Sequence, residues 1–293
     1  MKHIYLTLTI LAMTLLAACS GKETERPVLT VSVEPQRAIL REIVGDRYDV
    51  VTLIGNGANP ESYEPTMKAR MAVENSKAFF TTGSMPFEHL IAEAIDTANV
   101  RIVDCSQGIE PIYGTHSHHH HELHGTHGHH GHVETDKDPH IWASVRNGRR
   151  IARTMLRAII EIDPDGREYY TARHAVLDAR LDSLDRAIRR KLDGNPGAAF
   201  AIWHPSLSYY ARDYGLNQIA VGFENKEMTP THLAHVAEEA KEHGVRVFFF
   251  QKEYDSRQAE TLNREMQTRL VPINPMAYDW EKSLTEITEA LTQ

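Results

Sequence analysis

The chain has 293 residues, of which 41% are hydrophobic and 25% are charged, and its formal net charge is −8. This acidic balance argues against a nucleic-acid partner, because nucleic-acid-binding proteins present basic surfaces to the phosphates. The length exceeds what a single hydrophobic core usually covers and therefore predicts two lobes.

The chain begins with a pattern typical of a secretion signal. Lys2 precedes an apolar run at 4–18, which is too short to span a membrane but has the length of a signal-peptide core. The run ends in Leu-Ala-Ala-Cys, which is similar to a bacterial lipobox, so we expect cleavage before Cys19 and acylation of that residue. The alternative is an ordinary cleavage site followed by an incidental cysteine. We thus expect a signal peptide at 1–18, a tether at 19–26 and a lipid anchor on the extracytoplasmic side of a bacterial membrane.

The next part of the chain, 27–165, alternates between predicted strands and helices, as in a parallel sheet covered by helices. Cys105 follows the last of these strands, and we expect its thiol to be buried without a disulfide partner, because the chain has only two cysteines. Strands are predicted from apolar and β-branched runs at 28–33, 48–54, 78–82 and 100–104, and helices from hydrophobic spacing at 38–44 and 87–95.

A second set of similar elements occupies 194–293. Thr229 and Pro230 predict the start of one of its helices, as N-cap and first helical residue. Strands are predicted at 198–203, 218–223, 245–250 and 271–273, with further helices at 255–270 and from Trp280 to the end.

The two sets are connected by a segment with a strong helical pattern. Residues 167–192 contain neither Gly nor Pro, and their hydrophobic residues recur at helical spacing. We therefore expect an α/β fold of two lobes, each a parallel sheet flanked by helices, joined by one long rigid helix at 166–193. Such a helix resists wide hinge bending, because bending breaks hydrogen bonds. An ordinary surface helix of one domain would show the same pattern.

Histidine is concentrated in one internal segment, the His-rich loop at 115–132. Neutral imidazole is a common ligand for zinc, copper and nickel, so several rings on one segment can adapt to such an ion. A solvated low-complexity loop or an expression tag would have the same composition, but tags lie at the termini. We expect an auxiliary metal-collecting loop, whose histidines are His116, His118, His119, His120, His121, His124, His127, His129, His130 and His132.

Three other residues lie where a cleft between the lobes is expected. Ligands of parallel α/β sheets gather outside the carboxyl ends of the strands. Glu61 follows the second strand of the first lobe, His204 ends the first strand of the second lobe, and His140 lies just after the His-rich loop. A lone histidine after a strand is more often structural than a ligand. Together with a metal-collecting loop, however, the three residues predict a metal site.

Three motifs and the long helix carry a resemblance to a known family. The motifs are Gly-Ala-Asn-Pro-Glu-Ser-Tyr-Glu-Pro-Thr at 57–66, Asp-Pro-His-Ile-Trp at 138–142, and His204 with Tyr209, Tyr210, Tyr214 and Gly215 behind it. From Cys19 to its end, the chain resembles the metal-specific solute-binding lipoproteins of zinc and manganese ABC transporters, and within them the zinc-uptake type. The resemblance implies two lobes, a rigid linking helix, one metal in the interlobe cleft and delivery to a membrane permease. Zinc-type members have histidine at the position of His204, whereas manganese-type members usually have glutamate.

The chain departs from this family at positions that matter for the metal. The family usually has histidine where Glu61 stands, aspartate where Asn274 stands and glutamate where Gln251 stands. The resemblance therefore implies a site of Glu61, His140 and His204, with Asn274 or water as the fourth ligand. A carboxylate and two imidazoles suit zinc, and they also accept manganese or iron. Asn274 could instead cap a turn, because an amide oxygen is a poor zinc ligand.

Two other functions would use the same residues. A zinc hydrolase would add an open water position and Glu64 as general base, but the chain has no His-Glu-x-x-His element. A zinc-storing surface adhesin or buffer would need no transporter. The sequence favours a monomer that is not an enzyme, captures zinc outside the cytoplasm and passes it to an ABC permease in the membrane.

Overall fold

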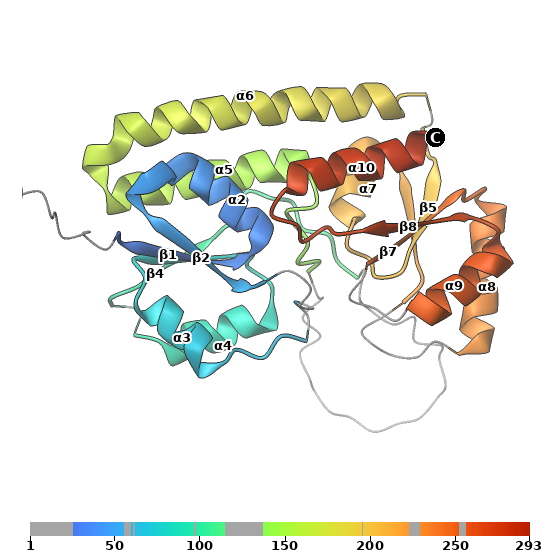
Figure 1. Cartoon of the computed structure of the whole chain (residues 1–293), viewed down its shortest axis with the longest axis horizontal. Helices are drawn as coiled ribbons and strands as arrows, with labels where there is room; N and C mark the ends of the chain where they lie inside the picture. Colours follow the sequence, from blue (N-terminus) through green and yellow to red (C-terminus); the bar gives the residue numbers. More distant parts are fainter. Residues whose placement is uncertain are drawn as a thin grey trace, which may run out of the picture.

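The computed structural model describes residues 26–55, 60, 62–96, 98–114, 137–194, 196–222, 229–251 and 256–293. Two α/β lobes lie side by side, and one long helix runs along both of them (Figure 1). Each lobe contains a four-stranded sheet with parallel pairing throughout. Among the described residues, no helix is both long and apolar enough to cross a membrane.

The first lobe has the strand order β2-β1-β3-β4. Pro35 lies in the first turn of its first helix, and Gly45 ends that helix with a φ of 57°, which favours glycine. The elements are β1 (Val28–Val33), α2 (Glu34–Val44), a 3-10 turn (Gly45–Arg47), β2 (Asp49–Ile54), α3 (Met67–Glu74), β3 (Ala78–Thr81), α4 (Pro86–Ala94), β4 (Arg101–Asp104), α5 (Val145–Ile162) and a second 3-10 turn (Pro164–Gly166). Cys105, just after β4, is fully buried, as the sequence predicts.

The second lobe repeats this order as β6-β5-β7-β8. Thr229 caps helix α8, since the Thr229 side chain accepts a hydrogen bond from the His232 backbone N–H. The elements are β5 (Ala199–Ile202), α7 (Ser208–Tyr214), β6 (Asn217–Ala220), α8 (Pro230–Glu242), β7 (Val247–Gln251), α9 (Ser256–Met266), β8 (Arg269–Ile273) and α10 (Trp280–Thr292). In both sheets the strand order changes direction between the two central strands, β1 and β3 in the first lobe and β5 and β7 in the second. Ligands of parallel α/β sheets bind at this point.

Several predicted boundaries differ from the structure by a few residues; for example, the strand expected at 218–223 ends at Ala220. The helix expected at 255–270 ends at Met266, because Gln267 adopts a left-handed φ of 55° that stops the helix. Arg269 and Leu270 then belong to β8 and pair with Val247 and Phe248. This pairing joins residues far apart in the sequence, so the local hydrophobic spacing does not indicate it.

The long helix α6 (Arg167–Leu192) is hydrogen-bonded to both lobes. Arg173 Nε donates to the Glu42 carbonyl in α2 at 2.7 Å. Arg180 forms an ion pair with Glu281 in α10 at 3.0 Å. Nearer its end, α6 also contacts α7. The predicted two-lobed α/β fold with a long joining helix is therefore confirmed.

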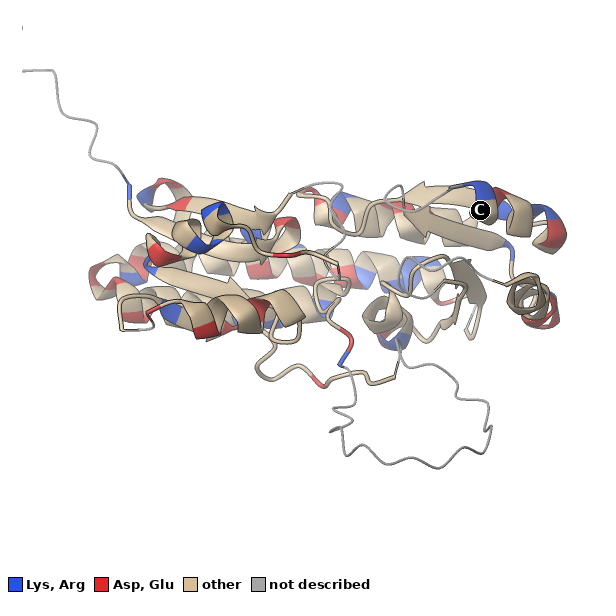
Figure 2. Ribbon diagram, turned by 90° about the horizontal axis from the view of Figure 1, so that it is seen from below, with Lys and Arg blue, Asp and Glu red and all other residues tan. Residues whose placement is uncertain are grey.

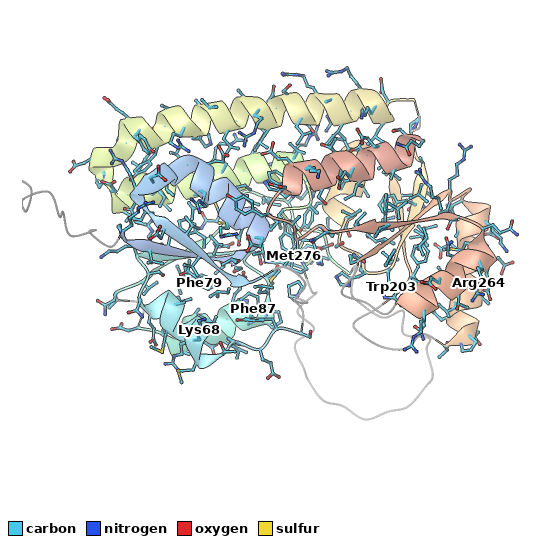
Figure 3. All side chains as sticks on the ribbon, viewed as in Figure 1. Lys68, Phe79, Phe87, Trp203, Arg264 and Met276 are labelled. Carbon is cyan, nitrogen blue, oxygen red and sulfur yellow. The ribbon has the colours of Figure 1, made fainter. Side chains whose placement is uncertain are left out.

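The lobes share a hydrophobic core on the side that faces α6. Buried residues of α6 such as Leu177 and Leu181 belong to one cluster with Trp280 of the second lobe and Phe79 of the first. A separate, smaller cluster lies between the second sheet and helices α8 and α9, and it includes Trp203. Met276 belongs to the larger cluster and, in the view of Figure 3, lies between Phe79 and Trp203. Charged residues of both signs are interspersed along the helices, whereas the strands are largely uncharged (Figure 2).

We expect Gly148→Ala to destabilise the protein at the junction of the lobes. A Cβ atom at this position of α5 would lie 2.5 Å from Cη2 of Trp280. Alanine is better than glycine in a helix by about 1 kcal/mol, but forcing an atom against a buried ring costs about 1–3 kcal/mol. The urea midpoint of unfolding should fall. Gly194→Ala, where no described atom lies within 4 Å of the added Cβ, is the control; equal midpoints for the two variants would contradict the prediction.

Candidate metal centre

His140 is held by a carboxylate two residues before it. Asp138 Oδ1 accepts one hydrogen bond from the His140 backbone N–H at 2.9 Å and another from His140 Nδ1 at 2.8 Å. An ionised carboxylate can only accept, so Nδ1 carries a proton, and in the neutral ring Nε2 presents its lone pair. A carboxylate behind the imidazole is the usual support of a metal-bound histidine. The His140 ring therefore has the orientation that a metal-bound histidine would need.

Trp142 fixes the other side of this ring. The ring centroids of His140 and Trp142 lie 5.2 Å apart, in an edge-to-face arrangement. The indole Nε1 of Trp142 donates to the Pro275 carbonyl at 3.0 Å, and Pro275 belongs to the second lobe. The position of His140 in the first lobe thus depends on a contact with the second lobe.

His204 follows β5, and a neutral amide holds its backbone. Gln251, at the end of β7, donates from Nε2 to the His204 carbonyl and to Ser206 Oγ, both at 2.8 Å. Its Oε1 accepts from the His204 N–H at 3.3 Å. These contacts use both the donor and the acceptor of the amide, which a carboxylate could not supply. The amide of Gln251 therefore suits the local hydrogen bonding, which a glutamate at this position could not complete.

The two imidazoles meet between the lobes. His140 Nε2 and His204 Nε2 lie 3.3 Å apart, and the residues are only 2% and 4% exposed. Two nitrogen ligands at 2.0–2.1 Å from a tetrahedral zinc ion are separated by about 3.3 Å, which follows from the bond length and the tetrahedral angle. The spacing therefore fits two ligands of one ion.

The other predicted site residues have different outcomes. Glu61, Cys19 and the His-rich loop lie outside the described residues. Asn274 Oδ1 accepts from the Met276 N–H at 3.0 Å, which is the turn-capping arrangement considered from the sequence. Within the described ranges, no group of three or more His, Cys, Asp or Glu side chains is placed to hold a metal. The assignment of these residues as metal ligands, the two histidines included, stays a prediction.

The segment next to Glu61 is supported by the start of α4. The Tyr63 and Phe87 rings pack edge to face, with centroids 5.1 Å apart. The adjacent Glu88 is buried, and its carboxylate accepts from Ser32 Oγ at 2.5 Å and from the Thr82 N–H at 2.6 Å. Burial raises the pKa of Glu88, while these hydrogen bonds oppose the rise. This buried network ties the carboxyl ends of β1 and β3 to the helix that carries Phe87.

Sequence reasoning did not identify the residues that orient the histidines. Asp138 could have been found, because an aspartate two residues before a histidine commonly accepts local N–H groups. Tyr209 of α7 donates to the Asp138 carbonyl at 3.0 Å and accepts from the Ile112 N–H at 3.3 Å. Burial raises the pKa of Tyr209 to about 12, so its hydroxyl keeps the proton that it donates. The reach of Tyr209 into the other lobe has no signal in the local sequence.

A family profile and two relatives agree on the family to which this chain is related. The profile of the family described as "Zinc-uptake complex component A periplasmic" matches residues 29–293. The chain is 28% identical over 275 residues to the high-affinity zinc uptake system protein ZnuA of Bacillus subtilis, a match that covers 89% of this chain and 85% of the relative. It is 26% identical over 299 residues to the zinc-binding lipoprotein AdcA of Streptococcus pneumoniae, a match that covers 98% of this chain and 56% of the relative. The chain thus spans little more than half of that longer protein.

The fold agrees with this relationship. A crystal structure of a ZnuA deletion mutant with zinc bound has a TM-score of 0.77 and 29% identity, covering 92% of this chain and 99% of the other. The family profile extends from β1 to the last residue and so includes both lobes and the long helix between them. The chain therefore belongs to the zinc-uptake complex component A family of periplasmic proteins.

Proposed function

We propose that the protein captures a zinc ion between its lobes and delivers it to an ABC importer. The observation that carries this proposal is the 3.3 Å separation of two buried Nε2 atoms, one from each lobe. Asp138 makes His140 Nε2 an acceptor, so the partner nitrogen must either donate a proton to it or share a cation with it. A 3.3 Å separation allows the hydrogen bond and also equals the spacing of two nitrogen ligands on one tetrahedral cation.

Zinc is the ion that these ligands favour. Imidazole is a borderline nitrogen donor, which zinc binds well in four-coordinate sites. We propose Glu61 as the third ligand and Asn274 or water as the fourth. One carboxylate with two neutral imidazoles leaves a zinc site with a net charge of about +1. Manganese and iron share these ligands but prefer more oxygen donors and higher coordination.

The remaining features fit a protein of the cell envelope. We propose that Cys19 is acylated and anchors a monomer to the extracytoplasmic side of a bacterial membrane. The partner is the permease of the importer, and the His-rich loop collects ions near the cleft. The relatives ZnuA and AdcA are named for zinc uptake and zinc binding, and AdcA is named a lipoprotein, which supports this arrangement.

We expect His140→Ala and His204→Ala each to abolish tight zinc binding. Each change removes one of the two imidazole ligands, so the loss should exceed the roughly 10–100-fold that follows when only a supporting residue is removed. Competition with a zinc chelator measures this affinity. His235→Ala removes an exposed histidine of α8 and serves as the control. Wild-type affinity in both cleft variants would refute the proposed site.

Replacement of Glu61 tests the third ligand. Glu61→Ala removes a ligand and a negative charge, so the tight site should weaken by orders of magnitude. Glu61→His should retain zinc and lose affinity for manganese relative to zinc, because it exchanges an oxygen donor for a nitrogen donor. Calorimetry with both metals measures the two effects. If Glu61→Ala binds zinc as tightly as the wild type, the carboxylate is not a ligand.

Deletion of the His-rich segment from His116 to His132 tests the division between loop and cleft. The number of zinc ions bound should fall while one tight site remains, because the cleft histidines are held by residues outside this segment. Metal analysis after dialysis, followed by titration, measures both quantities. A loss of the tight site would show that the loop contributes to it.

A further inference from the structure

Helix α7 connects the two proposed histidine ligands. It begins at Ser208, four residues after His204, and therefore moves with the segment that carries that ligand. Its Tyr209 hydroxyl reaches the first lobe, where it donates to the Asp138 carbonyl and accepts from the Ile112 N–H. Asp138 in turn holds the His140 ring through Nδ1. A chain of direct contacts thus runs from one ligand to the other.

The same helix also holds the chain on the other side of His140. Asp213 lies one helical turn after Tyr209, so the two residues share a face of α7. Its carboxylate accepts a hydrogen bond from Ser144 Oγ, and Ser144 is the N-cap of α5. Helix α7 therefore hydrogen-bonds to the segment that carries His140 at Asp138, before the histidine, and at Ser144, after it.

Helix α7 is itself fixed to the rest of the molecule. The Tyr214 hydroxyl donates to Asp185 of α6 at 2.9 Å, and Arg189 Nη2 of α6 donates to the Asp213 carbonyl at 3.0 Å. The Tyr210 hydroxyl lies 2.6 Å from Thr288 Oγ1 in α10. A displacement of α7 would break contacts with the linking helix and with the second lobe.

We infer that Tyr209 is a positioning residue for His140, and that α7 sets the separation of the two imidazoles across the lobe boundary before an ion binds. This inference rests on the proposed function, because it assigns a role toward the same metal. Without the hydroxyl, the Asp138 carbonyl and the Ile112 N–H lose their common partner. Asp138 and His140 can then rotate, and the ion must order them when it binds.

The test compares Tyr209→Phe with Tyr210→Phe in the full chain. The two tyrosines are neighbours in the chain and are 1% and 0% exposed, so each variant removes one buried hydroxyl. Both variants should lose similar stability, but only Tyr209→Phe should weaken the tightest zinc site, by roughly 10–100-fold, the range for residues that support a ligand. Chelator competition measures the affinity. Cobalt absorption should change in band position only for Tyr209→Phe, because it reports ligand geometry rather than stability.

Two comparisons keep this inference separate from the proposed function. His140→Ala in the same assay must abolish the tight site; if it does not, the proposed function fails. If His140→Ala abolishes the site but Tyr209→Phe binds zinc and cobalt as the wild type does, the inference fails. Should Tyr209→Phe not fold, Asp213→Asn takes its place, since it preserves the side-chain shape and weakens the hold on Ser144. Wild-type affinity and an unchanged cobalt spectrum in that variant would equally overturn the inference.

Discussion

The close approach of two imidazole nitrogens, one from each lobe, requires both lobes to be held in one arrangement. His140 Nε2 and His204 Nε2 lie 3.3 Å apart, and both residues are almost fully buried. Such a pair requires precise placement of both residues, because buried polar atoms in poor geometry cost free energy. Asp138 and Trp142 hold one ring, and Gln251 holds the backbone of the other.

The long helix and the shared core are the large-scale counterpart of this local constraint. Two lobes joined only by flexible strands could change their relative position by several ångströms. Here, α6 is bonded to α2, α7 and α10, and the main hydrophobic cluster extends across both lobes. These contacts keep the lobes in one arrangement, so that residues far apart in the sequence can be placed with the precision that metal coordination requires.

Much of the fold could be predicted because its signals are local. β1 coincides with the apolar run at 28–33, and α6 coincides with the segment free of Gly and Pro. The end of α9 could not be predicted from the sequence, because Arg269 and Leu270 are strand residues only through their pairing with Val247 and Phe248. The same distinction holds at the site. His140 and His204 were expected there, and the structure brings them together, but the reach of Tyr209 to Asp138 depends on tertiary contacts alone.

The division of the hydrophobic residues into two clusters bears on how the protein opens. The larger cluster spans both lobes, so its elements should unfold as one cooperative unit, whereas the smaller cluster under α8 and α9 can open at lower free energy. Trp203 belongs to the smaller cluster, while Leu207 belongs to the larger one, so His204 lies on the boundary between two regions of different local stability. A sub-global opening of α8 and α9 should therefore reach the neighbourhood of His204 while the long helix stays folded.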